Sequence, residues 1–396
     1  MKLAVVGFGQ CGGRIADEFS RFNANARFHR GIQIINGAFA VNTDAADLSS
    51  LYSISSDYQH RILIGNRKTG GHGVGKINEM GAEIAREDGD KVIDAIRSAR
   101  HFYEADAFLL IAGVAGGTGS GSMPIMTQTI KERFQDKKVY ACVVLPFEHE
   151  EKTDARTLFN SATCLKAVYQ VADAVFLVDN QRYVEKDSSL INNMSAINRL
   201  IAAPFYDLLC AGEEKKAKNI GARLLDAGDI MQTLGGWTVL GYGTSPLPAI
   251  RNPFEFRRHF RKKSSETHKG IQAMDEAISN LSLSCDPKDT GSALYLLSAP
   301  TRDMNMDMVK ELGDYLSSIA PQAIIRYGDY PRNGSNLKIT VILSQLSSVE
   351  KVKGYYIRMP DLMAEQQKKE EASEAKLKAL VTASASVPSL FSGNGS

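Results

Sequence analysis

The feature that most limits how this chain can fold is an apolar run that ends in a cluster of glycines. Phe108–Val114 is the longest apolar stretch, and residues 107–111 have the length and composition of a buried strand. Five glycines follow within Gly113–Gly121, together with two hydroxyl side chains, before a helix predicted to start near Pro124. A tight strand-to-helix turn needs fewer glycines, whereas successive glycine N–H groups form a nest that binds anions. We therefore predict that phosphate is bound by Gly116, Gly117, Thr118, Gly119 and Ser120.

Apolar strands alternate with helical patterns through the first half of the chain. Strands are predicted at residues 3–6, 38–41, 61–64, 107–111, 139–145 and 174–178. Helical spacing is found at residues 13–21, 77–100 and 125–133, and in a segment that ends near Tyr169. Strands that are apolar on both faces and alternate with helices are typical of a parallel, doubly wound α/β sheet.

The second half has a different organisation. A single long helix is predicted over Ser188–Leu209, followed by a charged break after Gly212. Strands then recur at residues 237–240, 293–297, 323–327 and 337–343, with helices at 266–280 and 304–318, which indicates a smaller α/β domain. We expect a first domain at 1–185, a helix and connector at 186–221, a second domain at 222–360 and a disordered tail at 361–396. Within this tail, charged residues and Ala favour a short helix after Asp361.

Composition argues against several classes of protein. The 396 residues carry 47 Lys plus Arg and 45 Asp plus Glu, a net charge of +2, which does not favour nucleic acid as a partner. The five cysteines form no CxxC pair and the seven histidines no HExxH pattern, so neither a metal site nor a disulfide framework is expected. No apolar stretch approaches the ~18 residues of a membrane span. The N-terminus turns glycine-rich too early for a signal peptide, so we expect a cytoplasmic protein.

Two further glycine clusters accompany the first. Gly7–Gly12 reads GFGQCG, a GxGxxG pattern between a strand and a helix, which alone would suit an NAD-dependent oxidoreductase with a Rossmann loop. That fingerprint expects an acidic residue ~20 positions after the glycines. The acidic residue at the end of the second strand, Asp44, lies further along the chain than this. Gly70–Lys76 nearly matches a Walker loop, but Ile77 stands where the motif requires Ser or Thr. Three glycine loops in one sheet suit a triphosphate gripped from several sides.

The ordered set of motifs resembles the tubulin/FtsZ superfamily of GTP-dependent polymer-forming proteins, from residue 1 to about residue 360. GGTGSG after a buried strand looks like the signature of that superfamily. The other similar segments are GQCGG at 9–13, VNTDAADL at 41–48, GHGVGKINEMG at 71–81, VDNQ at 178–181 and INRLI at 197–201. Within the superfamily, GFGQCGG, LYLLSAP at 294–300 and YGDYPR at 327–332 are most similar to CetZ, the archaeal cell-shape branch.

The resemblance implies roles for particular residues. Gln10, Cys11 and Gly12 would lie beside the α- and β-phosphates, and Asp44, Gly71 and Gly73 near the γ-phosphate. The segment after Pro146 would hold the ribose, with Glu150 and Arg156 as candidates. Asn180 and Asn198 would read the guanine, because an amide offers both a donor and an acceptor, and Met194 would cover the base. GTP and GDP are then the expected ligands, with Mg²⁺ held mainly by phosphates and water.

The resemblance also implies a catalytic pair, Asp226 and Asp229. FtsZ carries an NxDxxD motif after its central helix and inserts it into the neighbouring subunit's nucleotide site. Here Leu224 replaces the first position, so only DxxD remains. Two carboxylates three residues apart at the start of a helix can point the same way and orient a water. They would equally suit a helix N-terminus without any catalytic role.

The resulting expectation is a two-domain α/β GTPase with a tubulin/FtsZ-like fold that polymerises head to tail and is activated by self-assembly. The CetZ similarity implies control of archaeal cell shape, with a division-ring FtsZ as the alternative within the superfamily. Expected partners are further copies of the chain, and candidates besides these are other tubulin/FtsZ-like proteins or an adaptor at VPSLF near the end. The basic stretch 257–263 is interpreted as a solvated loop or a lateral contact between filaments.

Overall fold

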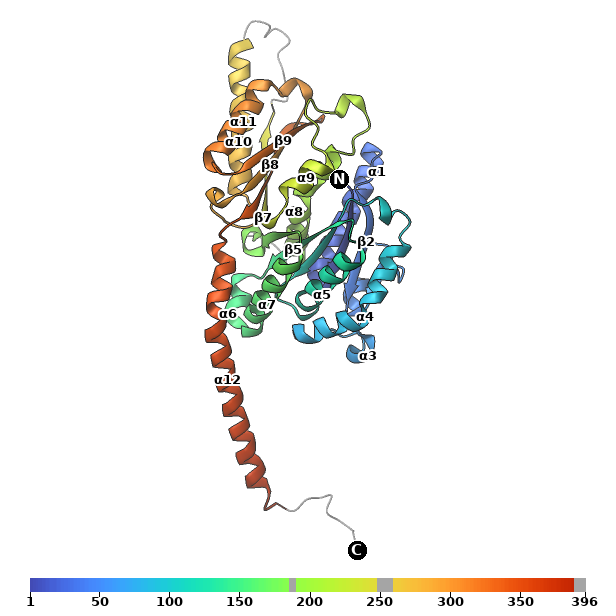
Figure 1. Ribbon diagram of the computed structural model, residues 1–396, viewed down its shortest axis with the longest axis vertical. Helices are drawn as coiled ribbons and strands as arrows, with labels where there is room; N and C mark the ends of the chain where they lie inside the picture. The colour runs from blue at the N-terminus through green and yellow to red at the C-terminus, as the bar shows by residue number, and fades with distance from the viewer. Residues whose placement is uncertain (185–189, 248–258, 388–396) are drawn as a thin grey trace.

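The computed structural model describes residues 1–184, 190–247 and 259–387, whose strands form one sheet (Figure 1). The strand order is β3-β2-β1-β4-β5-β6-β7-β10-β8-β9. The strands are β1 (Leu3–Phe8), β2 (Ile35–Asn42), β3 (Arg61–Leu63), β4 (Ala107–Gly113), β5 (Lys138–Leu145), β6 (Ala174–Asp179), β7 (Gly236–Pro246), β8 (Ser292–Ala299), β9 (Ile324–Pro331) and β10 (Asn336–Leu346).

The first six strands in sequence are all parallel, as the sequence predicted. The strands β1, β4, β5 and β6 are buried on both faces. Alternate residues of β1 belong to two cores: Ala4, Val6 and Phe8 face one, and Leu3 and Val5 the other. The helices of this half are α1 (Gly9–Arg30), α2 (Ala45–Ser49), α3 (Asn66–Thr69), α4 (Asn78–Ser98), α5 (Gly117–Arg133), α6 (Glu148–Thr153) and α7 (Ala155–Val171). Because the strands are parallel, their carboxyl ends lie along one edge of the sheet.

The long central helix is α8 (Leu190–Ala211), and the start predicted at Ser188 lies outside the described residues. It packs beside α1 on one face of the sheet, and its buried side chains include Ile197, Ile201 and Phe205. The Phe205 ring lies 5.3 Å from the ring of Phe19 in α1. The helix therefore spans the first half of the molecule, from the end of β6 toward the second half.

The second half continues the same sheet instead of starting a separate one. β7 pairs in parallel with β6 and antiparallel with β10. Its helices are α9 (Ala227–Thr233), α10 (His259–Ser279) and α11 (Met306–Ile319). Single 3₁₀ turns occur at η1 (Phe102–Glu104), η2 (Asn180–Tyr183), η3 (Ala217–Asn219), η4 (Pro287–Asp289) and η5 (Thr301–Asp303). The basic stretch 257–263 falls on residues whose side chains the structure does not describe.

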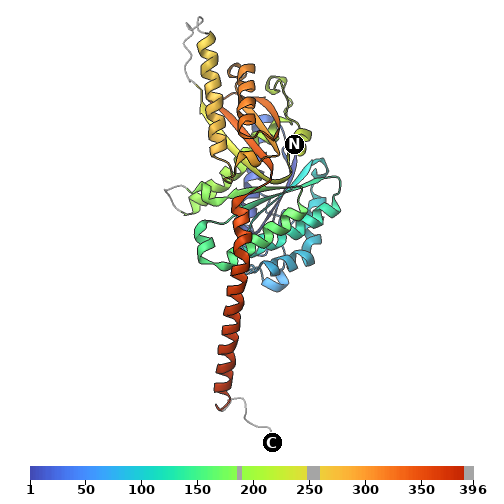
Figure 2. The ribbon, with the colours of Figure 1, turned by 60° about the vertical axis from the view of Figure 1, so that its left-hand side comes forward.

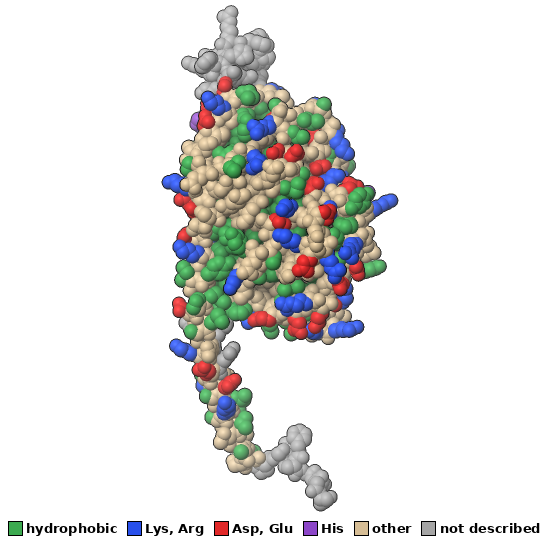
Figure 3. Space-filling view, in the orientation of Figure 1, with side chains coloured by type: hydrophobic (Ala, Val, Ile, Leu, Met, Phe, Trp, Pro, Cys, Tyr) green, Lys and Arg blue, Asp and Glu red, His purple; other side chains and the backbone are tan. Residues whose placement is uncertain are grey.

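The expectation of a disordered tail is wrong for residues 361–384. α12 runs over Glu350–Ser384 and extends away from the body, as Figures 1 and 2 both show. Ala, Glu, Lys and Gln dominate this stretch, and these are strong helix formers even without packing. Beyond the body, positive, negative and hydrophobic side chains are interspersed along the helix (Figure 3). Most of VPSLF, 388–391, lies outside the described residues, and none of the described helices is both long and apolar enough to cross a membrane.

Candidate nucleotide site

The glycine loops meet at the carboxyl edge of the parallel strands, around the point where the strand order reverses. β1 lies between β2 and β4 in the sheet. After β1 the chain adds β2 and β3 on one side of β1, and it then crosses to the other side to form β4. In open α/β sheets such a switch point leaves a crevice between neighbouring loops, and ligands bind there. The segments that follow β1, β2, β4, β5 and β6 all begin at this edge.

The loop after β4 is the first turn of a helix. α5 begins at Gly117, with Gly116 as its N-cap, although the predicted helix starts near Pro124. The first N–H groups of a helix have no partner within the helix and attract anions. An added Cβ at Gly117 would lie 2.6 Å from Val74 Cγ2, but at Gly116 it would meet nothing within 4 Å. Gly117 is therefore needed for packing, whereas Gly116 borders open space on the side where a phosphate would lie.

The loop after β1 lies directly against this turn. α1 begins at Gly9, whose φ of +67° favours glycine, and an added Cβ there would be 3.1 Å from Gly119 N. Gly12 is packed so closely that a Cβ would lie 2.1 Å from Ile111 O. Gln10, on the exposed side, donates from Nε2 to Asp47 Oδ1 at 2.7 Å.

Cys11 follows in the same turn and is half-buried. Burial, and secondarily the charge of Glu150, raise the pKa of its thiol to about 12. Cys11 is therefore a neutral lining residue at neutral pH, not a nucleophile.

The structure brings the predicted γ-phosphate residues together. Asp44 caps α2, where its Oδ1 accepts N–H bonds from Ala46 at 2.9 Å and Asp47 at 3.1 Å, and it forms an isolated bridge with His72. Gly71 and Gly73 have φ of +80° and +79°, so this loop requires glycine to fold back on Asp44.

Lys76 ends the third glycine loop and points elsewhere. Its Nζ lies 2.9 Å from Asp154 Oδ2, in an ion pair at the start of α7. A Walker lysine reaches the phosphates, so this contact agrees with the sequence argument against a Walker loop.

The two residues expected at the ribose differ in their surroundings. Glu150 lies in the first turn of α6, where its Oε2 accepts the Phe147 N–H at 3.0 Å, and its charge acts on Cys11. Arg156 is instead engaged by Glu79, and its Nε donates to Lys76 O at 3.3 Å. Glu150 thus lies near Cys11 of the first glycine loop, whereas Arg156 braces the third glycine loop.

Two asparagines lie where the base is expected. Asn180 opens η2 directly after β6, and Asn198 lies in α8, which contacts η2. The residues are 8% and 6% exposed, and within the described parts of the chain neither side-chain amide has a hydrogen-bond partner. Met194, one turn before Asn198, is partly buried against the core between α8 and the sheet. Buried amides without a protein partner suit a polar ligand edge.

Sequence reasoning missed two residues that hold the loops together. Thr43 Oγ1 lies 2.7 Å from Thr118 Oγ1, and this contact joins the loop after β2 to the glycine turn after β4. Asn160 Nδ2 donates to the carbonyls of Lys76 at 2.9 Å and Ala115 at 3.0 Å, so α7 fixes two loops at once. VNTD could have drawn attention to Thr43, but Asn160 lies in the middle of an amphipathic helix and gives no local signal.

Oxygen ligands for a cation are available beside the first two loops. Asp47 accepts from Gln10 and, at 3.1 Å, from Asn42 Nδ2, and Asp44 is its neighbour on α2. Mg²⁺ prefers carboxylates, water and substrate phosphates. Over the described part of the chain, no group of three or more His, Cys, Asp or Glu is placed to hold a metal. These residues fit an ion that takes most of its ligands from phosphates and water.

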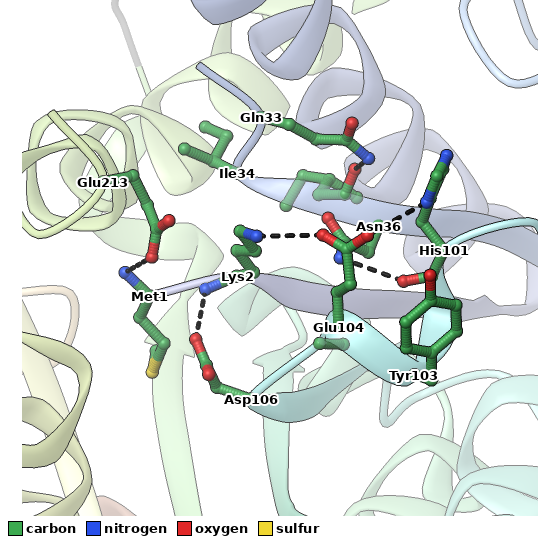
Figure 4. Close-up of polar contacts among 12 residues, drawn as sticks. Met1, Lys2, Gln33, Ile34, Asn36, His101, Tyr103, Glu104, Asp106 and Glu213 are labelled. Atoms are coloured by element: carbon green, nitrogen blue, oxygen red, sulfur yellow. Dashed lines mark hydrogen bonds and ion pairs between the residues drawn. The ribbon is translucent and has the colours of Figure 1, made fainter. Parts of the chain in front are cut away.

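The structure does not bring Asp226 and Asp229 to the glycine loops. Asp226 caps α9, with Oδ1 accepting the Asp229 N–H at 2.9 Å. An added Cβ on Gly212 would lie 3.3 Å from Asp226 Cα and 3.6 Å from Met1 N, so the pair lies at the start of β1. Figure 1 shows α9 beside the N-terminus. In Figure 4, Met1 N pairs with Glu213 at 3.0 Å, next to Lys2 and Asp106 at the starts of β1 and β4.

The length of the strands sets the separation between acids and loops. β1 has six residues, which at ~3.3 Å each span roughly 20 Å. The glycine loops follow its carboxyl end, and the acids lie beyond its amino end. Within one subunit, Asp226 and Asp229 are therefore too far from the loops to touch a nucleotide bound there.

Comparison with known families places this arrangement in a class. Residues 2–186 match the model of the Tubulin/FtsZ family, GTPase domain, and the chain belongs to that family. Residues 187–358 match the Tubulin-like CetZ, C-terminal domain. The chain is thus a member of the CetZ branch, as the motifs predicted, and the oxidoreductase alternative is not supported.

Individual relatives agree over nearly the whole length. Tubulin-like protein CetZ1 of Haloferax volcanii is 30% identical over 367 residues, which is 89% of this chain and 90% of the relative. The solved GDP-bound monomer of that organism's CetZ1 is similar with a TM-score of 0.76 and 29% identity, covering 93% of this chain and all of the other. Its CetZ2, solved as a GTPγS-bound protofilament, has a TM-score of 0.78 and 27% identity, with the same coverage.

Proposed function

We propose that the chain binds GTP at the glycine loops, assembles head to tail, and hydrolyses GTP only where the acid loop of the next subunit completes the site. The observation that carries this proposal is the placement of Asp226 and Asp229 at the amino end of the parallel strands, while the glycine loops lie at their carboxyl end. Stacking two subunits along the strand direction would bring one acid loop over the other subunit's phosphates. The GTPγS-bound protofilament of the related CetZ2 supports this mode of assembly.

The chemistry at such a junction is transfer of the γ-phosphoryl group to water. The water oxygen bonds to the γ-phosphorus, the bond from that phosphorus to the β–γ bridging oxygen breaks, and GDP and phosphate leave. Asp226 and Asp229 orient the water and accept its proton, while the N–H groups at the start of α5 hold the phosphates in line. A bound Mg²⁺ would supply charge neutralisation on the phosphate oxygens. Removing a carboxylate that positions the nucleophile should cost ~10²–10⁴-fold in rate.

A mixing experiment tests hydrolysis in trans. Asp226→Ala subunits bind GTP but bring no complete acid pair, so they are acceptors. Gly116→Asp subunits place a carboxylate where phosphate should lie but keep their acids, so they are donors. Neither variant should hydrolyse GTP alone. The mixture should recover activity at junctions where the acid pair of a donor subunit meets the GTP bound by an acceptor subunit. If the two variants co-sediment as polymers without recovering any turnover, the acids do not act across the junction.

We further propose that the filaments are cytoplasmic and serve cell shape and not the division ring. The match of residues 187–358 to the CetZ C-terminal domain supports this choice over FtsZ. A fluorescently tagged chain should distribute along the cell envelope, and its deletion should change cell outline without blocking division. A tagged chain confined to a mid-cell ring, with filamentous cells on deletion, would favour the division role.

A further inference from the structure

Residues 212–226 connect α8 to α9 and lead directly into the acid pair. Strand β9 contacts this connector. Asp329 in β9 accepts two connector N–H bonds, from Ala222 to Oδ2 at 2.9 Å and from Arg223 to Oδ1 at 2.6 Å. Asp329 N donates in return to Arg223 O at 3.1 Å. These three bonds fix the chain only three residues before Asp226.

Packing around Asp329 reinforces this grip. The Arg223 guanidinium lies 4.0 Å from the centre of the Tyr327 ring, the residue two before Asp329 in β9. Leu225 is 1% exposed, and an added Cβ on Gly328 would lie 2.7 Å from Leu225 Cβ. Arg326 Nε lies 4.0 Å from Asp229 Oδ1. Successive residues of β9 thus contact the connector from Arg223 through the second acid.

A buried polar network anchors the other end of the connector. Glu214 has a fully buried carboxylate that accepts from Tyr330 Oη and Arg332 Nη1, each at 3.2 Å. Tyr330 Oη in turn accepts from Arg30 Nη1 at 2.9 Å, at the end of α1. Burial tends to raise the pKa of Glu214, but hydrogen bonds from the Lys216 N–H, from Tyr330 and from the Lys215 N–H outweigh it and hold the pKa below 4.5.

The network extends to the central helix. Arg30 Nη2 pairs with Asp207 Oδ1 of α8 at 2.8 Å, and both side chains are less than 10% exposed. Breaking such a buried pair on one side leaves an uncompensated charge. Helices of the GTPase half are thereby tied to β9, which holds the acid loop.

We infer that β9 positions the acid loop for the neighbouring subunit's nucleotide, with Asp329 as the positioning residue. This inference rests on the proposed hydrolysis in trans. In this assignment Asp329 acts through the connector that it holds, and not by contact with the substrate or the attacking water. Its loss should therefore impair a subunit as donor of the acids, while leaving the nucleotide loops of that same subunit unaffected.

Separating the two roles of a subunit tests this assignment. Asp329→Asn preserves size but replaces one accepting oxygen by an NH₂ group that cannot accept the connector N–H. The substitution is placed in the donor (Gly116→Asp) and, separately, in the acceptor (Asp226→Ala), and each is mixed with the unaltered counterpart. Asp286→Asn is the matched control, because Asp286 accepts the Lys288 N–H at 3.0 Å in the same half but does not touch the connector.

The expected result is asymmetric. In the donor, Asp329→Asn should lower the recovered turnover ~10–100-fold, since small misplacements of reacting groups have effects of that order. In the acceptor it should change turnover and GTP affinity less than about twofold, and Asp286→Asn should have no effect in either subunit.

Each other outcome overturns the inference. Equal losses in donor and acceptor, or failure of the altered donor to co-sediment with the acceptor, would show a general role in folding or assembly. An undiminished donor would show that Asp329 does not position the acids. No recovery in the unaltered pair would refute hydrolysis in trans itself, and with it any such role for Asp329.

Discussion

Gly116→Asp should abolish GTP binding without unfolding the protein. The residue has φ of −77°, which any amino acid can adopt, and a Cβ added there meets no protein atom within 4 Å. A phosphate held by the first N–H groups of α5 would lie close to the new carboxylate. At an effective dielectric constant of about 20, two unit charges about 5 Å apart repel by about 3 kcal/mol, or more than 100-fold in affinity.

The assay is a titration of each variant with a fluorescent GTP analogue, together with its thermal unfolding. Gly116→Asn has nearly the same shape but no charge, so it should lose much less affinity than Gly116→Asp. Gly117→Ala should instead destabilise the fold, because its Cβ would lie 2.6 Å from Val74 and 2.8 Å from Ile77 N. Wild-type affinity in Gly116→Asp, or equal losses in the Asp and Asn variants, would refute the placement of the phosphates.

Three further outcomes are expected. Asn198→Ala should lose ~1–3 kcal/mol of preference for GTP over ATP in a competition titration, and a wild type that binds both nucleotides equally would refute base reading by this residue. Deletion of residues 365–396 should leave the melting temperature nearly unchanged, because the buried contacts of α12, such as Tyr355, precede the cut; a large drop would show that the tail packs on the body. Hydrogen bonds hold the pKa of Glu214 below its ordinary value, so the stability that its carboxylate contributes is fully present above that ordinary value and is lost as pH falls through the lowered pKa. The melting temperatures of wild type and Glu214→Gln should therefore converge on acidification, and a pH-independent difference would contradict this.

The parallel half of the sheet was predictable because each strand carries its own signal. Strands such as 107–111 are apolar on both faces, and only a sheet covered by helices on both sides buries them. The predicted starts of α1 and α5 were too late, because glycine and serine have weak helix propensity and were assigned to loops. In the structure these residues form the first helical turns, whose N–H groups have no partner within the helix. The tail helix is much longer than the short helix predicted after Asp361, because an apolar pattern was sought where propensity alone sustains the helix.

Long-range contacts left no trace in any local pattern. Asn160 contacts carbonyls more than 40 residues away, and Arg30 pairs with Asp207 and Tyr330 across 177 and 300 residues. Such partners are set by how elements pack, which spacing within one segment does not reveal. The residues that we propose to bind nucleotide could be picked out from the sequence because they cluster in glycine loops at strand ends, whereas the residues that brace those loops do not.

The most direct test of the account is GTP turnover per subunit as a function of protein concentration. If the acids act only at junctions, dilute subunits should bind GTP but hydrolyse it at a background rate. Turnover per subunit should then rise steeply at the concentration at which light scattering first detects polymer, and Asp226→Ala should polymerise without that rise. Turnover per subunit that is the same below and above the onset of polymerisation would show that each subunit hydrolyses its own nucleotide, and would contradict the central claim.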